Sequence, residues 1–365
     1  MNSLPLYDFL PINILSRCFN DVTNSYKFYW FLSILEHFIE TGEHAIHIND
    51  IAFRMISSAW YPLDFFKLSF GKQDGLKIIS LYLSSKIVFD HSPNSSSLNE
   101  QIISNLSKEE IRILYSKINK LIRYVPFRFL RPFFSNELRG LQDQIVDIKI
   151  KDLSNKNILE KKLPYSFENK KIILNPIWLE YLSSNQIILK GFVKWKLLHF
   201  IQKNNPNIFG ITEKLDKPIA RNMKIAIKYW RSYLNQNDIR CIFSNQILNK
   251  FNISIDHFLP WSYLAHDLNW NLAPTTKEIN SSKGNNIPSF NDYFEKFAIM
   301  QYDSFKFNYK VLSENILSEY SLLFCDKLEN IYNYSFQIFY DKMSKFYLPQ
   351  IQIAQNMGFN YGWKY

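Results

Sequence analysis

Apolar residues recur at helical spacing through most of the first two hundred residues of the chain. The stretch 24–42 is apolar on nearly all sides and ends in a glycine, which predicts a buried helix that stops there. Ser107 and Glu110 have the spacing of a capping box, and an apolar stripe continues from them up to Pro126. We therefore expect residues 1–212 to form a mostly helical N-terminal region.

Two segments of this region depart from the helical pattern. Residues 123–134, RYVPFRFLRPFF, interleave three arginines with four phenylalanines, a composition that would suit the stacking of nucleic-acid bases. The alternative, which we favour, is a connection broken by proline whose aromatic rings enter the core. Residues 147–172 are rich in lysine, which predicts a polar surface segment with a short strand near residues 170–175.

Residues 217–234 form an amphipathic pattern with one cationic side. At about 100° per residue, five apolar residues fall on one side of a helix. These residues are Ile219, Met223, Ala226, Trp230 and Leu234. The opposite side carries the cations Arg221, Lys224, Lys228 and Arg231. A solvated surface and a surface that tracks a phosphate backbone are both consistent with this pattern.

Composition and charge narrow the class of protein. The 365 residues have a formal net charge of +10, and a basic surface suits a polyanionic partner such as nucleic acid. Only 9 glycines are present, and the glycine-rich patterns of phosphate-binding loops do not occur. Three cysteines lie far apart, no signal-peptide pattern begins the chain, and no apolar run is long enough to cross a membrane. We therefore expect a cytoplasmic protein that is not associated with a membrane.

The helical pattern returns near the C-terminus. Residues 289–300 and 313–346 carry apolar residues at helical spacing. We expect residues 301–365 to form a C-terminal helical region.

Between these regions lies a cluster of polar residues with few chemical types. Two short β-prone pieces flank a polar turn around Ser244 and Asn245, which suggests a hairpin. Asp256 and His257 come where the second piece ends. The sequence after Pro274 can form a short helix, so the strands and the helix would close on one another.

This closure would bring Asp256 near enough to Asn280 to share an ion. Carboxylate and amide oxygens are ligands that suit Mg²⁺ or Mn²⁺. The neutral imidazole of His257 can accept a proton from water near pH 7. The cluster therefore predicts metal-assisted chemistry on a phosphodiester.

Several short patterns recur in a fixed order over residues 238–290: DH, PWS, WNL-P, N-x-x-K and N-x-P. This order resembles the ββα-metal finger of the HNH endonuclease superfamily, in the form with His, Asn and Asn. The end of the stretch is similar to the HNH domain of CRISPR nucleases. The resemblance covers about a seventh of the chain.

The resemblance implies a role for each matching residue. His257 would be the general base, and Asp256 and Asn280 would hold the metal ion. Asn271 would support catalysis by holding the loop after His257 in shape, and Lys283 would contact a substrate phosphate.

Two further residues are candidates for substrate contact. We add Arg240 as a second phosphate contact. His266 could lie near the substrate, although a surface or loop-anchoring role is the alternative that we favour.

One departure from the family pattern concerns zinc. Many relatives stabilise the finger with a zinc ion held by two Cys-x-x-Cys pairs, but here the corresponding positions read Cys241-Ile-Phe-Ser244 and Thr276-Lys-Glu-Ile279. One thiolate cannot build a tetrahedral zinc site, so we expect no zinc. The finger would be held instead by packing of the apolar residues Phe243, Leu259, Trp261 and Trp270.

Together these features predict a mainly α protein with a small α+β insert, in which helical regions flank a ββα-metal finger. Residues 1–212 would recognise the target or a partner, residues 213–300 would form the nuclease domain with its basic helix, and residues 301–365 would follow as helices. We expect an endonuclease that uses Mg²⁺ or Mn²⁺ and cuts double-stranded DNA, and it resembles prokaryotic restriction or anti-phage enzymes. The sequence leaves open whether the chain binds a protein partner or forms a homodimer.

Two alternatives also stay open. The chain could be a nucleic-acid-binding module whose finger has lost its activity. It could also be a docking subunit of a multi-protein defence complex with little activity alone.

Overall fold

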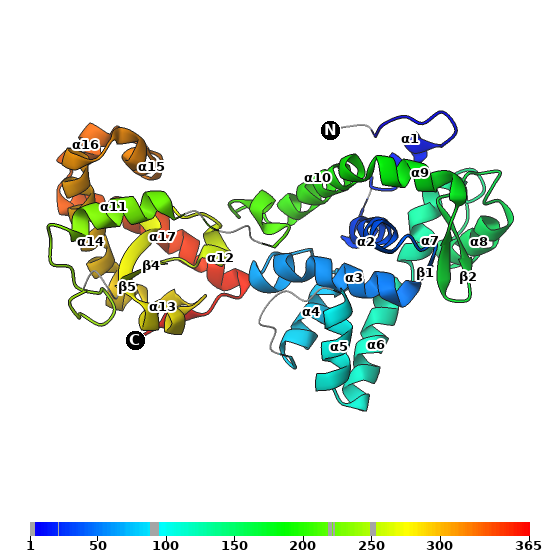
Figure 1. Ribbon diagram of the computed structural model, residues 1–365, viewed down its shortest axis with the longest axis horizontal. Coiled ribbons are helices and arrows are strands. Elements are labelled where there is room, and N and C mark those ends of the chain that lie inside the picture. The colour runs from blue at the N-terminus through cyan, green and yellow to red at the C-terminus, as the bar shows by residue number, and fades with distance from the viewer. Residues whose placement is uncertain (1–3, 21, 88–94, 218–220, 222, 249–252) are drawn as a thin grey trace. The chain divides into compact units, whose positions relative to one another are not determined.

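The computed structural model describes residues 4–20, 22–87, 95–217, 221, 223–248 and 253–365 (Figure 1). Ile219 of the expected apolar stripe lies outside the described residues. The chain divides into two compact units. The first unit comprises Met1–Pro206 and Lys214–Lys217, and the second comprises Asn207–Glu213 and Pro218–Tyr365. The expected class, mainly α with small α+β elements, is confirmed.

The first unit is built from helices and one small antiparallel sheet, in which β3 lies between β1 and β2. Its helices are α1 (Ile12–Arg17), α2 (Tyr26–Thr41), α3 (Ile48–Trp60), the π-helix η1 (Tyr61–Phe65), α4 (Gly75–Ser84), α5 (Ser95–Asn105), α6 (Lys108–Ile122), α7 (Val125–Leu130), the 3₁₀ helix η2 (Arg131–Phe134), α8 (Asp143–Lys156), α9 (Pro176–Ser184) and α10 (Gln186–Asn204). Its strands are β1 (Ala45–His47), β2 (Tyr165–Glu168) and β3 (Lys171–Leu174). The short 3₁₀ helix η3 (Ile211–Lys214) lies where the chain passes between the units.

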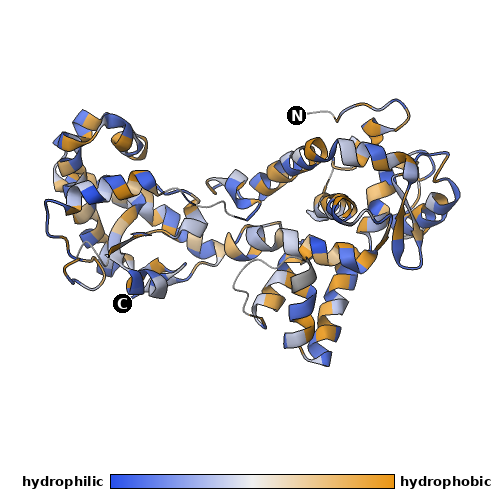
Figure 2. Cartoon of the chain, in the orientation of Figure 1, coloured by the Kyte–Doolittle hydropathy of each residue, from blue (hydrophilic) through white to orange (hydrophobic). Residues whose placement is uncertain are grey.

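The helix ends follow from the sequence signals. Helix α2 stops at Gly42, which has φ +71° and therefore occupies the left-handed region that glycine enters without strain. Helix α6 begins with the expected capping box, in which the Glu110 amide donates to Ser107 Oγ and the Ser107 amide donates to Glu110 Oε2. In Figure 2 helices α5 and α6 are banded in orange and blue, as expected for amphipathic helices.

The segment RYVPFRFLRPFF forms α7 and η2, and its rings face inward. Phe129, Phe133 and Phe134 are buried, so the favoured interpretation as a core connection is confirmed. Within residues 147–172 most lysines are exposed, which is consistent with the expected surface segment, and its first part continues α8 through Lys156. The short strand expected near residues 170–175 is present as β3.

The second unit surrounds a two-stranded antiparallel sheet with helices. Its helices are α11 (Lys224–Leu234), α12 (Trp261–Leu264), the 3₁₀ helix η4 (Asn269–Asn271), α13 (Lys277–Lys283), α14 (Phe290–Val311), α15 (Glu314–Phe324), α16 (Leu328–Asn333) and α17 (Phe336–Met357). Its strands are β4 (Ile253–His257), β5 (Leu272–Thr276), β6 (Ile287–Pro288) and β7 (Tyr361–Trp363). β4 pairs with β5, and β6 pairs with β7.

The C-terminal helices pack directly on the loop between β4 and β5. Tyr347 of α17 donates a hydrogen bond of 2.8 Å from its hydroxyl to the Trp270 carbonyl. Phe258 stacks on Phe297 of α14 with ring centroids 4.5 Å apart. These contacts hold the two ends of the loop between β4 and β5, so the polar cluster rests on an apolar base.

Candidate active site

The polar cluster lies on a ββα arrangement formed by β4, β5 and α13. The two strands pair from Ile253 opposite Thr276 to His257 opposite Leu272. Thr276 caps the helix, because its hydroxyl accepts a hydrogen bond of 3.3 Å from the Ile279 amide. The structure therefore has a strand pair followed by a helix, as the sequence suggested. The strand that ends in Asp256 and His257 is, however, the first of the pair and not the second.

The hairpin expected around Ser244 and Asn245 is a separate turn that precedes the ββα arrangement. The bridge between Arg240 and Ile247 closes this turn, and Asp256 and His257 end the first strand of the later pair. The sequence pattern missed β5 because Pro274 interrupts it and offers no amide hydrogen to a ladder. A two-stranded sheet tolerates this proline because each strand has one open edge.

His257 is held between two carboxylates. Its Nε2 lies 2.9 Å from Asp267 Oδ1, and its Nδ1 lies 4.0 Å from Asp256 Oδ1. The side chain is only 4% exposed. A carboxylate accepts a hydrogen bond, so we assign the ring proton to Nε2, which leaves the Nδ1 lone pair toward Asp256.

Asp267 is a site residue that the sequence analysis did not identify. It lies in the loop after α12, ten positions beyond His257. An acidic residue in a polar loop shortly after the Asp-His pair was the available signal. It was weak, because the loop length that brings the two side chains together is decided by the fold.

Asp256 is buried and pairs with a lysine. Its Oδ1 accepts a hydrogen bond of 2.7 Å from the His257 amide. Its Oδ2 lies 3.0 Å from Lys283 Nζ, yet it receives no hydrogen bond of acceptable geometry from the described residues. Lys283 itself is fully buried. The structure thus places Lys283 against the expected metal ligand, whereas the sequence suggested an exposed contact with phosphate.

Helix α13 brings Asn280 against strand β4, which carries Asp256. Its amide nitrogen donates a hydrogen bond of 2.8 Å to Ser254 Oγ. Ser254 and Asp256 are two positions apart on β4, so their side chains project from the same face of the strand. The side-chain oxygen of Asn280, Oδ1, accepts no recorded hydrogen bond from the described residues.

These residues fit a hard divalent cation. Asp256 Oδ2 is a buried carboxylate oxygen without a hydrogen bond, Asn280 offers a carbonyl oxygen nearby, and the Lys283 ammonium marks a position where positive charge is stabilised. No group of three or more His, Cys, Asp or Glu side chains able to hold a metal occurs within the described parts of the chain. Mg²⁺ commonly binds through one or two protein oxygens and completes its shell with water and substrate phosphate.

Asn271 clamps the loop that follows His257. Its Oδ1 accepts a hydrogen bond of 2.9 Å from the Leu259 amide, and its Nδ2 donates one of 2.8 Å to the Leu259 carbonyl. The Asn271 carbonyl also accepts a hydrogen bond of 2.7 Å from the Phe258 amide. The side chain is fully buried and is therefore placed to shape the loop.

Glu319 of α15 contacts the loop that carries Asn271. Its Oε1 accepts a hydrogen bond of 2.5 Å from the Asn269 amide. Burial raises the pKa of this carboxyl to about 7, although the hydrogen bonds from Asn269 and Trp270 oppose that effect. The loop that carries Asn271 thus rests on a group that titrates near neutral pH.

We expect the stability of the protein to fall as the pH rises from 4.5 to 7. In this window folded Glu319 keeps a proton that the unfolded chain has lost, because its folded pKa is the higher one. Each unit of difference between the folded and the unfolded pKa corresponds to about 1.4 kcal/mol of stability. Solvent screening of the partly exposed carboxyl reduces the total expected loss to about 2 kcal/mol. Urea unfolding between pH 4.5 and 8 measures this, and Glu319→Gln should make the decline smaller by about that amount. The exposed Glu314→Gln on the same helix should leave it unchanged, and an unchanged decline in Glu319→Gln would contradict the assignment.

Packing contacts hold the hairpin and the loop near the positions that carry zinc ligands in many relatives. Cys241 Sγ lies 3.3 Å from Thr275 Oγ1 and is buried. Phe243 contacts Tyr293 of α14 with ring centroids 5.1 Å apart, and Trp270 contacts Phe346 of α17 at 5.1 Å. The hairpin and the loop are therefore anchored to the flanking helices by aromatic rings.

Three candidates for substrate contact occupy different positions. Arg221 precedes α11, and its guanidinium lies 3.9 Å from Asp267 Oδ1 and over the Trp261 ring. Arg240 is exposed and donates a hydrogen bond of 3.0 Å to the Asn245 carbonyl. His266 packs edge to face on Trp270, with ring centroids 5.2 Å apart.

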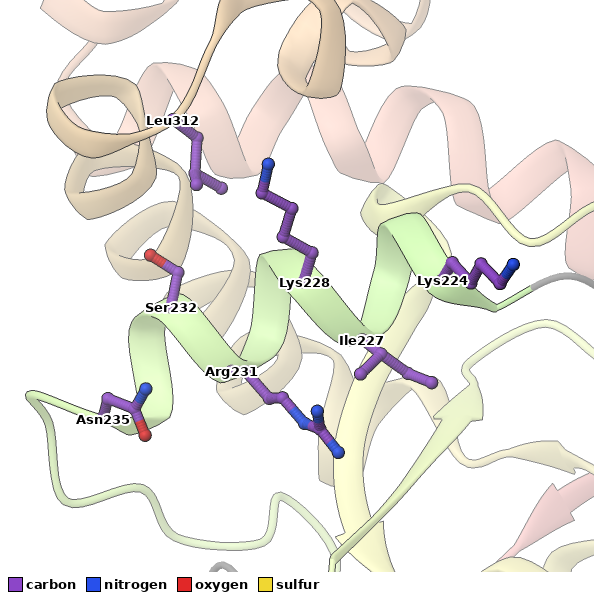
Figure 3. Close-up of a pocket in the computed structure, with 7 residues that line it drawn as sticks. All are labelled: Lys224, Ile227, Lys228, Arg231, Ser232, Asn235 and Leu312. Carbon is purple, nitrogen blue, oxygen red and sulfur yellow. The ribbon is translucent and has the colours of Figure 1, made fainter.

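The remaining cations of the amphipathic segment lie on α11. Lys224, Lys228 and Arg231 are exposed, whereas Tyr229 and Trp230 are buried. The three cations line a shallow hollow of about 600 Å³ together with Ile227 and Leu312. Figure 3 shows the Lys228 and Arg231 side chains pointing to different sides of α11, Lys228 toward Leu312. Arg221 is therefore near the polar cluster, and the other three line a separate part of the surface.

Residues 240–289 match the family model described as HNH endonuclease. Neither a curated protein nor a solved structure gave a match to the chain. Among the described residues, no helix is both long and apolar enough to cross a membrane.

Proposed function

We propose that this chain, whose residues 240–289 belong to the HNH endonuclease superfamily, is a metal-dependent endonuclease that cleaves double-stranded DNA. The observation that carries the proposal is His257, held by Asp267 on one ring nitrogen and facing Asp256 with the other. This arrangement fixes the tautomer of a general base next to a candidate metal ligand.

His257 would take the proton from the attacking water at Nδ1. Asp267 holds Nε2 and would stabilise the imidazolium that forms, since a carboxylate beside a histidine favours its charged state. Asn271 keeps the following loop in place through its two hydrogen bonds to Leu259. The base is thereby oriented before substrate arrives, which lowers the barrier without reorganisation in the transition state.

Asp256 and Asn280 would hold the divalent cation. When bound, the cation would stabilise negative charge on the phosphate and on the leaving oxygen. The Lys283 ammonium lies beside Asp256 Oδ2 and would hold this carboxylate in position. Arg221 lies on the far side of Asp267 and is a candidate contact for the substrate backbone.

The metal requirement is the test of the proposal. Purified protein should cleave plasmid DNA with Mg²⁺ or Mn²⁺, and EDTA should abolish the cleavage. Asn280→Ala removes one of the two oxygen ligands, so we expect a higher metal concentration for half-maximal rate. The exposed Asn291→Ala is a control that should behave as the wild type. Cleavage that persists in EDTA, or the same metal dependence in both variants, would contradict the ligand assignment.

We also propose a role in restriction or anti-phage defence. The support is the resemblance of residues 238–290 to such enzymes and the basic net charge. Cells that express the wild-type chain should resist phage infection relative to cells that express His257→Ala, as measured by plaque counts. Equal plaque counts against a broad phage panel would remove the defence role.

The exposed cations of α11 supply a separate prediction about binding. Changing Lys224, Lys228 and Arg231 to Gln should lower the slope of log affinity against log salt by about 0.9 for each phosphate interaction that the change removes, or about 2.7 in all. Titration of a labelled duplex in EDTA measures this slope. The matched control changes the exposed Lys296, Lys327 and Lys345 of the same unit to Gln. If both triple variants behave alike, α11 is only a solvated surface.

A further inference from the structure

The first unit contains a cavity whose lining is strongly cationic. Its volume is about 800 Å³, within the range of small-molecule sites. Five cations and one carboxylate are among the described residues that line it: Arg17, Lys27, Arg128, Arg131, Arg139 and Asp143. These residues come from α1, α2, α7, η2, the turn after η2 and the start of α8, so segments distant in sequence converge on one positive cavity.

Two of the three arginines of the segment 123–134 line this cavity, and none of its phenylalanines does. Phe129 and Phe134 are buried in the core, whereas Arg128 and Arg131 line the cavity. Because rings and guanidinium groups alternate in the sequence, the two kinds of side chain lie on opposite sides of α7 and η2.

Several contacts hold these guanidinium groups in position. The Arg128 guanidinium stacks over the Tyr124 ring at 4.4 Å and lies 3.5 Å from Asp147 Oδ1. Arg131 pairs with Asp143 at 3.2 Å. Arg128 Nε is the atom that faces Asp147 Oδ1, so this carboxylate holds the guanidinium in place at the cavity.

The cavity also has a surplus of positive charge. The two nearby carboxylates, Asp143 and Asp147, are paired with Arg131 and Arg128. Within the described part of the chain, no ion pair involves the Arg17 or Arg139 side chain. Both side chains are exposed and can therefore turn toward a ligand at the cavity.

We infer that this cavity is a binding site for a phosphate-bearing ligand. Planar guanidinium groups bind phosphate oxygens through paired hydrogen bonds, which explains arginine as the main cation here. The phosphate could belong to a nucleic-acid backbone or to a free nucleotide. The inference concerns the first unit only and stands independently of cleavage by residues 240–289.

The test compares two double variants of the full chain in EDTA. Arg17→Gln with Arg139→Gln removes the two unpaired cations of the cavity, and Lys170→Gln with Lys171→Gln removes two exposed cations elsewhere in the same unit. The probes are inorganic phosphate, ATP and a labelled single-stranded oligonucleotide. Calorimetry measures the first two, fluorescence anisotropy the third, and thermal unfolding confirms that both variants are folded.

We expect the wild type to bind at least one probe and the cavity variant to bind it at least about tenfold more weakly, with the control unchanged. Binding of ATP identifies a free nucleotide. Binding of the oligonucleotide alone identifies a backbone, and its salt slope should then fall by about 1.4 for two single-strand contacts. The inference is overturned if the wild type binds none of the probes, or if the cavity variant binds them as the control does.

Discussion

Replacing His257 by alanine should lower the rate of DNA cleavage by about 10²–10⁴-fold, the usual effect of losing a general base. The variant keeps Asp256 and Asn280, so we expect metal affinity and DNA affinity to stay close to those of the wild type. Single-turnover cleavage with saturating Mg²⁺ measures the rate, and titration with a labelled duplex in Ca²⁺ measures DNA binding.

Asp267→Asn provides the companion variant. The amide keeps the size of the side chain but removes the charge that stabilises the imidazolium of His257. We therefore expect Asp267→Asn to cleave more slowly than the wild type. The asparagine amide can also donate to Nε2, which would favour the tautomer with its proton on Nδ1 and so block the base. A purified His257→Ala protein that cleaves at the wild-type rate would show that the base lies elsewhere.

Replacing Asp256 by alanine should remove activity and also destabilise the fold by about 3–5 kcal/mol. The destabilisation arises because Lys283 is fully buried and would lose the carboxylate 3.0 Å from its ammonium. Urea unfolding without metal measures this free energy.

Two further variants separate charge pairing from metal binding. Asp256→Ala combined with Lys283→Met removes both buried charges, so stability should recover while the enzyme stays inactive. Lys283→Met alone leaves the carboxylate without its cation, so added Mg²⁺ should raise the melting temperature more than it does in the wild type. If the double variant is as unstable as Asp256→Ala, Lys283 does not pair with Asp256 in solution.

Much of the second unit could be predicted from local sequence. The Asp-His pair, the WNL-P pattern and the Asn-x-x-Lys spacing, through their resemblance to the HNH finger, predicted that Asp256, His257, Asn271 and Asn280 share one small site. The capping box at Ser107 and the glycine after α2 likewise fixed helix ends, because a cap depends on side chains within one turn. Such features involve neighbours along the chain and do not require the rest of the fold.

The tertiary structure decided which charges face one another. Lys283 has the sequence context of an exposed phosphate contact, but the direction of α13 turns its side chain into the core beside Asp256. Asp267 reaches His257, and Arg221 in turn reaches Asp267, only because the tertiary fold brings these separate segments together. Burial and pairing depend on how separate elements approach, and a periodic pattern of apolar residues specifies which face is buried but not what it meets.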